Sequence, residues 1–455
     1  MLEFLIVLTV LILMVGVIAA FHASGDVLHP LMLLGPLFLL STGVEPWLVR
    51  GELVRFFPNP EDVNIVLALY LFAVTGFVLG ALHYEFRSAS RTTGGRGRRL
   101  SEREKTVLLR LAAGLAAWAL VSYSYGIANA GGFETAFSRS KGGGFSTSGY
   151  LSEGMNLSLV AAVMVALARY RQGWTPGTLT LLLLGLLPNL VQGTFGGRRG
   201  PMFLALAAAM LSSFIARRAA PKIWLVWPSL GAAVLAVVFV GSQRQSLHLG
   251  SGEGVSWEGF AEALVQSDVD VGNNFIYGAG LVLATHHAGE FTWGRKLAVN
   301  LLVRPIPRQF WPTKYEDAGA TWVTSDYPGL GHVTRADWLG SVGWLPLPGS
   351  SAISIADLFG EFGWGAAFVF YLVGRGFAEL NRRRRMLGGM WQLLYFEALI
   401  LSIYLATQSF SAFYHRYLIL AVPTVIAWRL FVERRSIPAW RRVIRRPAAM
   451  GQAVR

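Results

Sequence analysis

Long apolar runs recur along most of this 455-residue chain, and they limit the folds open to it more than any other feature. A helix needs about 20 mostly apolar residues to cross the hydrocarbon core of a membrane, and about eleven segments approach this length. They are Leu2–Phe21, Val27–Val44, Val63–Leu82, Val107–Ile127, Glu153–Tyr170, Gly177–Val191, Pro201–Arg217, Ile223–Gly241, Ser354–Leu380, Trp391–Phe410 and Phe413–Val432. Only 15% of the residues are charged, against about 25% in soluble domains. We therefore expect an all-α polytopic membrane protein.

The basic residues indicate how these helices are oriented. A formal net charge of +14 would suggest nucleic-acid binding in a soluble protein. Here most of the positive charge lies between apolar runs, so we expect no nucleic-acid partner. If the helices alternate, five basic regions fall on one side: His83–Lys105, Arg169–Arg171, Arg217–Lys222, Asn381–Arg385 and the tail at 434–455. Lys and Arg are retained in the cytoplasm, which predicts a cytoplasmic C-terminus and, by parity, an N-terminus outside.

One long polar insert interrupts the apolar pattern late in the chain. We expect a membrane domain at 1–240 with about eight helices, an extracytoplasmic loop at 241–351, a membrane domain at 352–433 with about three helices, and a basic cytoplasmic tail at 434–455. Within the loop, Trp257–Val265 and Asn274–His286 predict amphipathic or re-entrant helices. The apolar runs near Pro188 are short, so two half-length helices are an alternative there.

A short outer turn carries two arginines between glycines. It spans Gly196–Pro201, reads GGRRGP, and places Arg198 and Arg199 at the start of an expected helix. Helix N-termini attract anions, and arginine forks match phosphate oxygens. The turn therefore predicts a phosphate or diphosphate site, to which the outer residues Arg139 and Lys141 would contribute. The alternative is a tight connector whose arginines reach lipid head groups.

The insert holds a second arginine pair and most of the aromatic candidates. Arg304 and Arg308 flank Pro-Ile-Pro, whose prolines force a stiff, extended arrangement. Fixed positive charge stabilises negative charge that develops in a transition state, but attachment to anionic lipids explains the same residues equally well. The candidate sugar-binding aromatic residues are Trp311, Tyr315, Trp322 and Trp338. Tryptophan rings also suit the membrane interface, which is the commoner use.

Several ionisable residues are candidates for proton transfer or ligand binding. Those in the insert are Asp326, His332, Arg335 and Asp337. Asp357 and Glu361 lie four residues apart at the outer end of an expected membrane helix, where carboxylates are costly and usually functional. The alternative is that both are hydrated at the interface. His415 and Arg416, near the outer end of the last helix, are candidates for the same cavity.

The sequence predicts no metal site and no cofactor. The chain has no cysteine, and the adjacent His286 and His287 lack an evident third ligand. It also lacks the His-Glu-x-x-His, Gly-x-Ser-x-Gly and Walker motifs, so metalloprotease, serine hydrolase and ATPase functions have no support.

The layout and one motif resemble the Wzy-type O-antigen polymerases. Residues 350–365 read SSAISIADLFGEFGWG, which is similar to the family's Ser/Thr-rich stretch, acidic residue and aromatic-x-x-Phe-Gly-x-x-Gly run. Asp357, Phe359, Phe362 and Gly363 match this pattern, whereas Gly365 is shifted. The outer glycine–arginine turn and the long late loop add to the resemblance.

The resemblance implies a metal-independent GT-C-type glycosyltransferase in the bacterial inner membrane. It would polymerise polyprenyl-diphosphate-linked oligosaccharide repeats at the outer face. Membrane lipids and a chain-length regulator protein are further candidate partners. Arg198 and Arg199 match the family's turn and would stabilise the leaving diphosphate, whereas Arg304 and Arg308 match only as arginines of the long loop. The base, if there is one, is among Asp326, His332, Asp337 and Glu361.

Two other functions stay open at this point. An O-antigen ligase, which transfers the finished glycan to a lipid A core, shares the same layout. A transporter or flippase of an amphipathic anion belongs to a different class. That class predicts paired internal repeats and polar residues buried at mid-membrane. The sequence shows no such repeat, and its expected spans are poor in charge.

Overall fold

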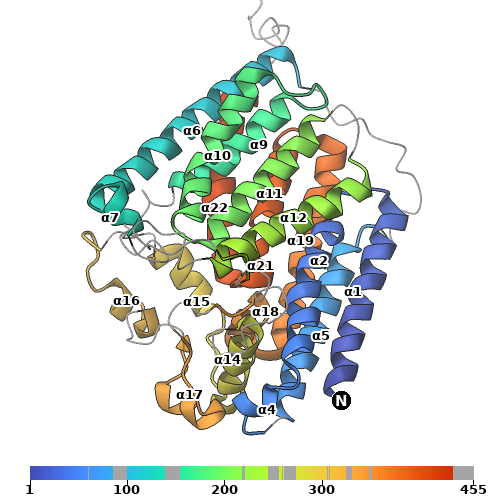
Figure 1. The fold of residues 1–455 in the computed structure, drawn as a ribbon, viewed down its shortest axis with the longest axis vertical. Helices are drawn as coiled ribbons and strands as arrows, with labels where there is room; N and C mark the ends of the chain where they lie inside the picture. Colours follow the sequence, from blue (N-terminus) through green and yellow to red (C-terminus); the bar gives the residue numbers. More distant parts are fainter. Residues whose placement is uncertain are drawn as a thin grey trace, which may run out of the picture.

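The computed structural model describes residues 1–59, 61–85, 100–138, 154–217, 221–243, 256–258, 260, 273–304, 306, 308–323, 330–347 and 351–433. These residues form helices and connecting segments, with no strand among them (Figure 1). The membrane-domain helices, in chain order, are α1 (Leu2–Ser24), α2 (Pro30–Leu39), η1 (Leu40–Val44), α3 (Glu45–Val49), α4 (Leu53–Phe56), α5 (Asp62–Ala81), α6 (Glu102–Asn129), α7 (Phe133–Phe137), η2 (Gly154–Asn156), α9 (Leu157–Ala168), α10 (Pro176–Thr194), α11 (Arg199–Ala216) and α12 (Ile223–Ser242).

The insert and the last part of the chain continue the helical order. The insert contains α14 (Asn274–Ala288), α15 (Arg295–Ala298), η3 (Val299–Val303), α16 (Lys314–Asp317), η4 (Thr321–Val323) and α17 (Arg335–Val342). It is followed by α18 (Ser354–Phe362), η6 (Gly363–Gly365), α19 (Ala366–Leu387), α20 (Met390–Leu401), α21 (Ile403–Thr407), α22 (Phe410–Ala427) and η7 (Trp428–Glu433).

Nine helical segments within the described ranges are long and apolar enough to cross a membrane. They are Leu2–Ser24, Pro30–Val49, Asp62–Ala81, Glu102–Asn129, Pro176–Thr194, Arg199–Ala216, Ser354–Leu387, Met390–Thr407 and Phe410–Glu433. Two shorter apolar helices, Gly154–Ala168 and Trp224–Val240, fall on the other two expected spans. The prediction of a polytopic helical membrane protein is confirmed. The count of eleven and the GT-C-like architecture stay predictions.

Local signals explain where several helices begin. Ser101 forms a capping box with Glu104: its hydroxyl accepts from the Glu104 N–H at 3.3 Å, and its own N–H donates to the Glu104 carboxylate at 2.8 Å. Asn273 caps α14, and Ser409 caps α22. Pro188 lies inside α10 without dividing it, so the alternative of two half-length helices is not adopted.

The helix expected at Ser354–Leu380 is broken. The turn at Gly363–Gly365 separates the short α18 from the long α19. Gly363 has φ of 55°, and a Cβ there would lie 3.0 Å from the Phe291 ring. Only glycine fits both conditions, and the second depends on the Phe291 ring of the insert. The break leaves α18 as a short helix of nine residues.

Glycines set the closest helix crossing, between α5 and α19. A Cβ on Gly80 would lie 2.1 Å from the Tyr371 carbonyl oxygen, and one on Gly374 would lie 2.3 Å from the Phe77 carbonyl oxygen. The two backbones touch at these points, as small residues allow in membrane helix pairs. This crossing joins the first part of the chain to the last.

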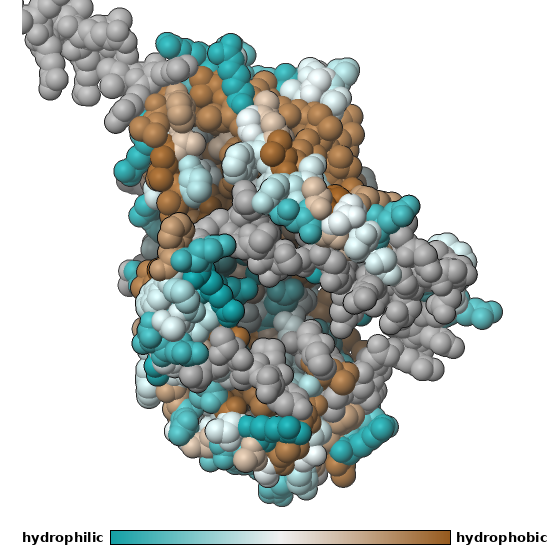
Figure 2. Space-filling model, turned by 90° about the vertical axis from the view of Figure 1, so that its left-hand side faces the viewer, coloured by the Kyte–Doolittle hydropathy of each residue, from teal (hydrophilic) through white to brown (hydrophobic). Residues whose placement is uncertain are grey.

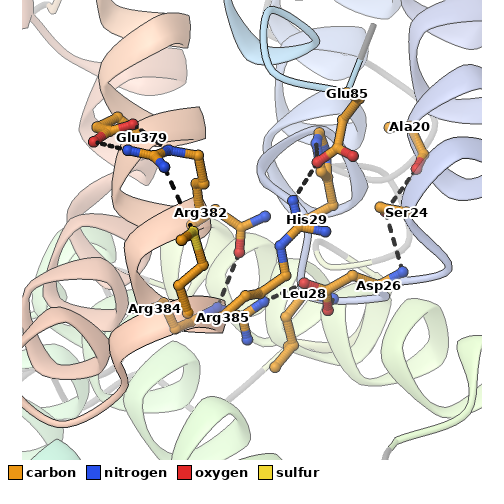
Figure 3. A network of polar contacts seen from close by, with 12 residues as sticks. Ala20, Ser24, Asp26, Leu28, His29, Glu85, Glu379, Arg382, Arg384 and Arg385 are labelled. Carbon is orange, nitrogen blue, oxygen red and sulfur yellow. Dashed lines mark hydrogen bonds and ion pairs between the residues drawn. The ribbon is translucent and has the colours of Figure 1, made fainter. Parts of the chain in front are cut away.

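Charged residues gather at the upper end of the molecule in Figure 1. There Arg384 pairs with Asp26, and Arg385 pairs with Glu85 (Figure 3). The N–H of Arg171 donates to the Ile215 carbonyl oxygen at 3.3 Å, which brings two more basic loops together. The basic regions that begin at Arg169 and Arg217 are therefore neighbours, while 86–99 and 434–455 lie outside the described residues.

The insert covers the opposite end. Figure 1 shows α14 and α17 at the lower end, together with α4, and α16 higher up on the left side. The Trp344 indole donates to the Phe56 carbonyl oxygen at 2.8 Å, and His287 lies 3.7 Å from Asp62. Helix α14 is buried almost throughout against α5, α17 and α18. The described part of the insert is therefore packed into the helix bundle. Most of the segment at Trp257–Val265 lies outside the described residues.

Candidate functional site

Two acidic residues of α18 lie inside the molecule, where the membrane helices meet the insert. Asp357 and Glu361 share one face of the helix because they are four residues apart. Their exposed fractions are 2% and 0%. The alternative of two hydrated interface residues therefore does not describe this structure. Carboxylates buried in this way are costly unless other groups compensate them.

Lys296 of α15 compensates Asp357. Its Nζ lies 2.5 Å from Asp357 Oδ1, and the N–H and hydroxyl of Ser411 both donate to Oδ2 at 3.1 Å. Burial lowers the pKa of Lys296, but the charge of Asp357 and its hydrogen bond outweigh burial and raise the pKa. Tyr277 faces the same pair, and burial raises its pKa to about 12. The result is a closed ion pair with its oxygens satisfied.

Glu361 lacks an equivalent partner. Both of its carboxylate oxygens are buried and make no hydrogen bond of normal geometry to a described residue. The Thr292 hydroxyl lies close to it but donates to the Gly360 carbonyl oxygen at 3.4 Å. The N–H groups of Thr292 and Trp293 donate to the carbonyl oxygens of Gly360 and Glu361 at 3.1 and 2.8 Å. This insert segment covers a carboxylate whose two oxygens are available to accept a proton.

His332 of the insert lies beside the C-terminal end of α18. Its Nε2 is 2.8 Å from the Glu290 carbonyl oxygen, and a Cβ on Gly360 would lie 3.4 Å from its Cε1. Burial lowers the pKa of His332 more than the Glu290 carbonyl raises it, and the charge of Lys296 lowers it further. The imidazole is therefore neutral, with Nε2–H donating to Glu290 and Nδ1 left as an acceptor.

The glycine–arginine turn forms the N-terminus of α11, as the sequence predicts. Gly197 has φ of 56°, and a Cβ on Gly196 would lie 2.4 Å from the Gln192 carbonyl oxygen, so both positions require glycine. Arg198 is the N-cap residue and makes no side-chain capping hydrogen bond. Burial lowers the pKa of Arg198, and the nearby Tyr123 opposes this. Arginine stays charged throughout the biological pH range.

Tyr404 of α21 connects this turn to α18. A Cβ on Gly200 would lie 3.5 Å from the Tyr404 hydroxyl oxygen, and the Ser354 hydroxyl donates to the Tyr404 carbonyl oxygen at 3.3 Å. The Arg416 guanidinium carbon lies 4.6 Å from the centroid of the Tyr404 ring. Helix α18, like α11, begins without a side-chain cap. Two uncapped helix N-termini thus lie beside one tyrosine, with Arg416 over its ring, and this arrangement suits an anion.

The second arginine pair lies on the surface of the insert. The side chains of Arg304 and Arg308 are exposed. Lys314, which is only 3% exposed, donates to the carbonyl oxygens of Val303 at 3.2 Å, Arg304 at 3.0 Å and Ile306. These bonds use all three donors of the ammonium group. Lys314 therefore fixes the backbone of the turn.

The candidate aromatic residues occupy three kinds of environment. The Trp311 indole donates to the Asp317 carboxylate at 2.5 Å, and Tyr315 lies beside an arginine, with 5.5 Å between its ring centroid and the guanidinium carbon of Arg308. Trp322 is half-buried, with the Arg295 guanidinium carbon 5.6 Å from its ring centroid. Trp338 has no exposed surface. Its ring packs against Tyr277 and Trp344, so it offers no free face to a sugar.

The remaining candidates are less closely connected to α18. Asp337 accepts a hydrogen bond from the Thr334 hydroxyl at the start of α17, and both Asp337 and Arg335 are exposed. His415 is half-buried on α22 beside Arg416. Arg139, Lys141 and Asp326 lie outside the residues that the structure describes.

One face of the molecule is hollowed. Figure 2 shows the face on which α7 and α16 lie in Figure 1, with a hollow at mid-height and hydrophilic surface along its left side. A surface depression is lined by the ends of α4 and α17 and the residues that follow them, among them Arg55, Phe57 and Trp344, and its lining does not include the α18 carboxylates. Over the described ranges, no group of three or more metal-binding side chains comes together.

Sequence reasoning did not identify Lys296, Ser411, Tyr277 or Tyr404. Lys296 lies 61 residues before Asp357, so only the tertiary fold brings them together. One signal was present, because Lys296 directly precedes the apolar stretch at 297–303, where a cation needs a partner. No model of a known protein family, no curated protein and no solved structure matches this chain.

Proposed function

We propose that this chain is a membrane glycosyltransferase that joins lipid-linked oligosaccharides at the outer face of the bacterial inner membrane. It would transfer a glycan from polyprenyl diphosphate to a sugar hydroxyl of a second lipid-linked repeat, as in O-antigen polymerisation. One observation carries the proposal: the uncapped N-termini of α11 and α18 both lie beside Tyr404, and α18 carries two buried carboxylates. Such a site offers an anion-binding region and a proton acceptor to one substrate.

The diphosphate binds where α11 and α18 begin. The first N–H groups of an uncapped helix are free to donate to phosphate oxygens. Arg416 adds positive charge beside Tyr404, and Arg198 and Arg199 add it at the start of α11, where the charge of Arg199 also acts on Glu45 of α3. The diphosphate gains negative charge as the glycosidic bond breaks, and fixed cations stabilise that charge without rearrangement.

Glu361 accepts the proton in this mechanism, and the nearby charge of Lys296 favours its ionised form. The acceptor hydroxyl attacks the anomeric carbon, and its proton passes to the Glu361 carboxylate. The bond from this carbon to the diphosphate breaks, and the electron pair leaves with the phosphate oxygen. Asp357 is less suited because Lys296 and Ser411 already occupy its oxygens. Since Glu361 is fully buried, the segment at 292–293 has to move aside for the acceptor.

The charge distribution supports the orientation in this proposal. Basic loops at one end stay in the cytoplasm with the C-terminus, and the insert then faces the outer side. The lipid chain of the substrate lies among membrane lipids, and a chain-length regulator is a further candidate partner. The GT-C-like architecture and the count of eleven spans belong to the same proposal.

Substitution of Glu361 and Arg199 tests the proposal. In cells that make the corresponding polysaccharide, Glu361→Gln and Arg199→Ala should shorten or abolish long glycan chains while the protein still accumulates in the membrane. Glu316→Gln is the matched control because Glu316 is an exposed carboxylate of the same insert. Glycan chains of unchanged length in both site variants would contradict the proposed site.

Purified protein separates polymerase from ligase. A ladder of products formed from a lipid-linked oligosaccharide alone, without an added lipid A core acceptor, is the expected result. Product that forms only when the core acceptor is present identifies a ligase instead.

A transporter of an amphipathic anion is the second candidate, and two observations favour it. The span at Ser354–Leu387 is discontinuous, and such helices form the binding sites of many transporters. Buried carboxylates also occur within the spans, although the sequence alone indicated few charges there. Movement of a labelled lipid-linked oligosaccharide across vesicles, with no new glycosidic bond, would favour this function.

A further inference from the structure

A carboxyl group in the middle of the membrane region takes no part in the proposed mechanism. Glu397 belongs to α20 and is only 1% exposed. Its Oε1 accepts a hydrogen bond of 2.7 Å from the Thr424 hydroxyl of α22, and its Oε2 is buried without a hydrogen-bond partner among the described residues. It is the eighth residue of the span Met390–Thr407, which places it close to mid-membrane.

Within the part of the chain that the structure describes, no cation pairs with Glu397. Helix α9 has no ionisable residue, and the one in α11, Arg199, stands at the far N-terminus of that helix. Charged residues in the last turns of α19 form ion pairs at the upper end of the molecule. Arg416 lies over Tyr404 of α21. Tyr417 lies near Glu397 on the same helix as Thr424, and its phenol carries no positive charge.

We propose that Glu397 is an intramembrane proton-binding site that holds its proton at neutral pH. An ionised carboxylate without a cation is strongly disfavoured in an apolar interior, so protonation is the way this residue can be accommodated. One carboxyl and one hydroxyl are too few ligands for a metal ion such as Ca²⁺, which takes about six to eight oxygens. The occupant is therefore a proton.

Loss of this proton would affect the N-terminal end of α22. An unpaired charge between α20 and α22 weakens their packing. Thr424, which contacts Glu397, lies 13 residues from Ser411, which donates to Asp357. That separation is roughly 20 Å along a helix. The proposal does not depend on the proposed function, because it rests on contacts that the mechanism does not use.

Labelling with a carbodiimide tests the protonation state directly. Dicyclohexylcarbodiimide is lipid-soluble and adds to protonated carboxyl groups: the proton goes to one nitrogen, the carboxyl oxygen bonds to the central carbon, and rearrangement gives a stable N-acylurea with no atom lost. We expect an adduct at Glu397 in the purified full-length protein at pH 7 that declines with rising pH, and no adduct at this position in Glu397→Gln.

If the reagent does not reach Glu397, the pH dependence of thermal unfolding tests whether Glu397 is protonated. An unfolded glutamate ionises near a pKa of about 4.3, so a native carboxyl that keeps its proton binds more protons than the unfolded chain. Stability then falls as pH rises. In detergent micelles the unfolding temperature of the wild type should fall more between pH 6 and 9 than that of Glu397→Gln, whose amide is neutral and similar in shape.

Two results would overturn the proposal. The first is an identical pH dependence of the unfolding temperature in the two proteins. The second is stabilisation of the wild type, but not of Glu397→Gln, by NaCl relative to N-methylglucamine chloride at equal ionic strength. That second result would identify a sodium site in place of a proton site.

Discussion

Replacement of Lys296 by methionine removes the cation from the ion pair between Lys296 of the insert and Asp357 of α18. Methionine keeps much of the side-chain volume and loses the ammonium group. Asp357 would stay 2% exposed, with only the two Ser411 donors at 3.1 Å. Removal of one partner from a buried ion pair costs about 3–5 kcal/mol. Because 25% of the Lys296 side chain is exposed, we expect the lower end of this range, about 3 kcal/mol.

A double substitution separates the charge effect from a general loss of packing. Lys296→Met with Asp357→Asn removes both charges and keeps an acceptor for Ser411. We expect this variant to be more stable than Lys296→Met alone by about 2 kcal/mol, because no buried charge is left without a partner. Arg308→Met is the control, since it removes an exposed cation of the same insert and should change stability by about 0.5 kcal/mol or less.

These free energies of unfolding can be measured with the purified protein in mixed micelles. The sodium dodecyl sulfate content is raised stepwise, and unfolding is followed by tryptophan fluorescence. The reasoning is refuted if Lys296→Met costs no more than the control. It is also refuted if the two single effects simply add in the double variant, because additivity means that the side chains do not interact.

Further substitutions test the packing described above. Gly80→Ala places a Cβ 2.1 Å from a backbone carbonyl oxygen of α19 and should destabilise the protein by about 2 kcal/mol or more. Gly114→Ala, in open space on α6, should be neutral or slightly stabilising in the same unfolding assay. Lys314→Met leaves three carbonyl groups without their donor, so limited trypsin digestion should cut the insert sooner than in the wild type; an unchanged digestion rate contradicts the role of Lys314. Arg384→Gln should cost about 3 kcal/mol by thermal unfolding, and Asp26→Asn in the same chain should recover part of it; no recovery would mean that the pair is not a stabilising contact.

The sequence predicted the helices well because the membrane imposes a length and a composition on each of them. It did not predict the break at Gly363, since that depends on the approach of the Phe291 ring. Asp357 and Glu361 were identified because carboxylates are rare in apolar segments.

Their partners were not identified, because Lys296 and Ser411 come from distant parts of the chain. Contacts of this kind depend on the tertiary fold, and the local pattern of residues around Lys296 gives no register against α18. For the same reason the burial of Trp338 could not be predicted. Tryptophans are typical of the membrane interface, but this one is fully buried by the tertiary fold.

The glycine contact between α5 and α19 also has a consequence for biosynthesis. Gly80 and Gly374 are separated by nearly 300 residues, and a ribosome adds about 5–20 residues per second. Helix α5 therefore waits roughly 15–60 s in the membrane before its partner emerges. During this time its glycine surface is open to lipid or to a membrane chaperone. Chains that end before α19 should expose this surface permanently, which would mark them for degradation.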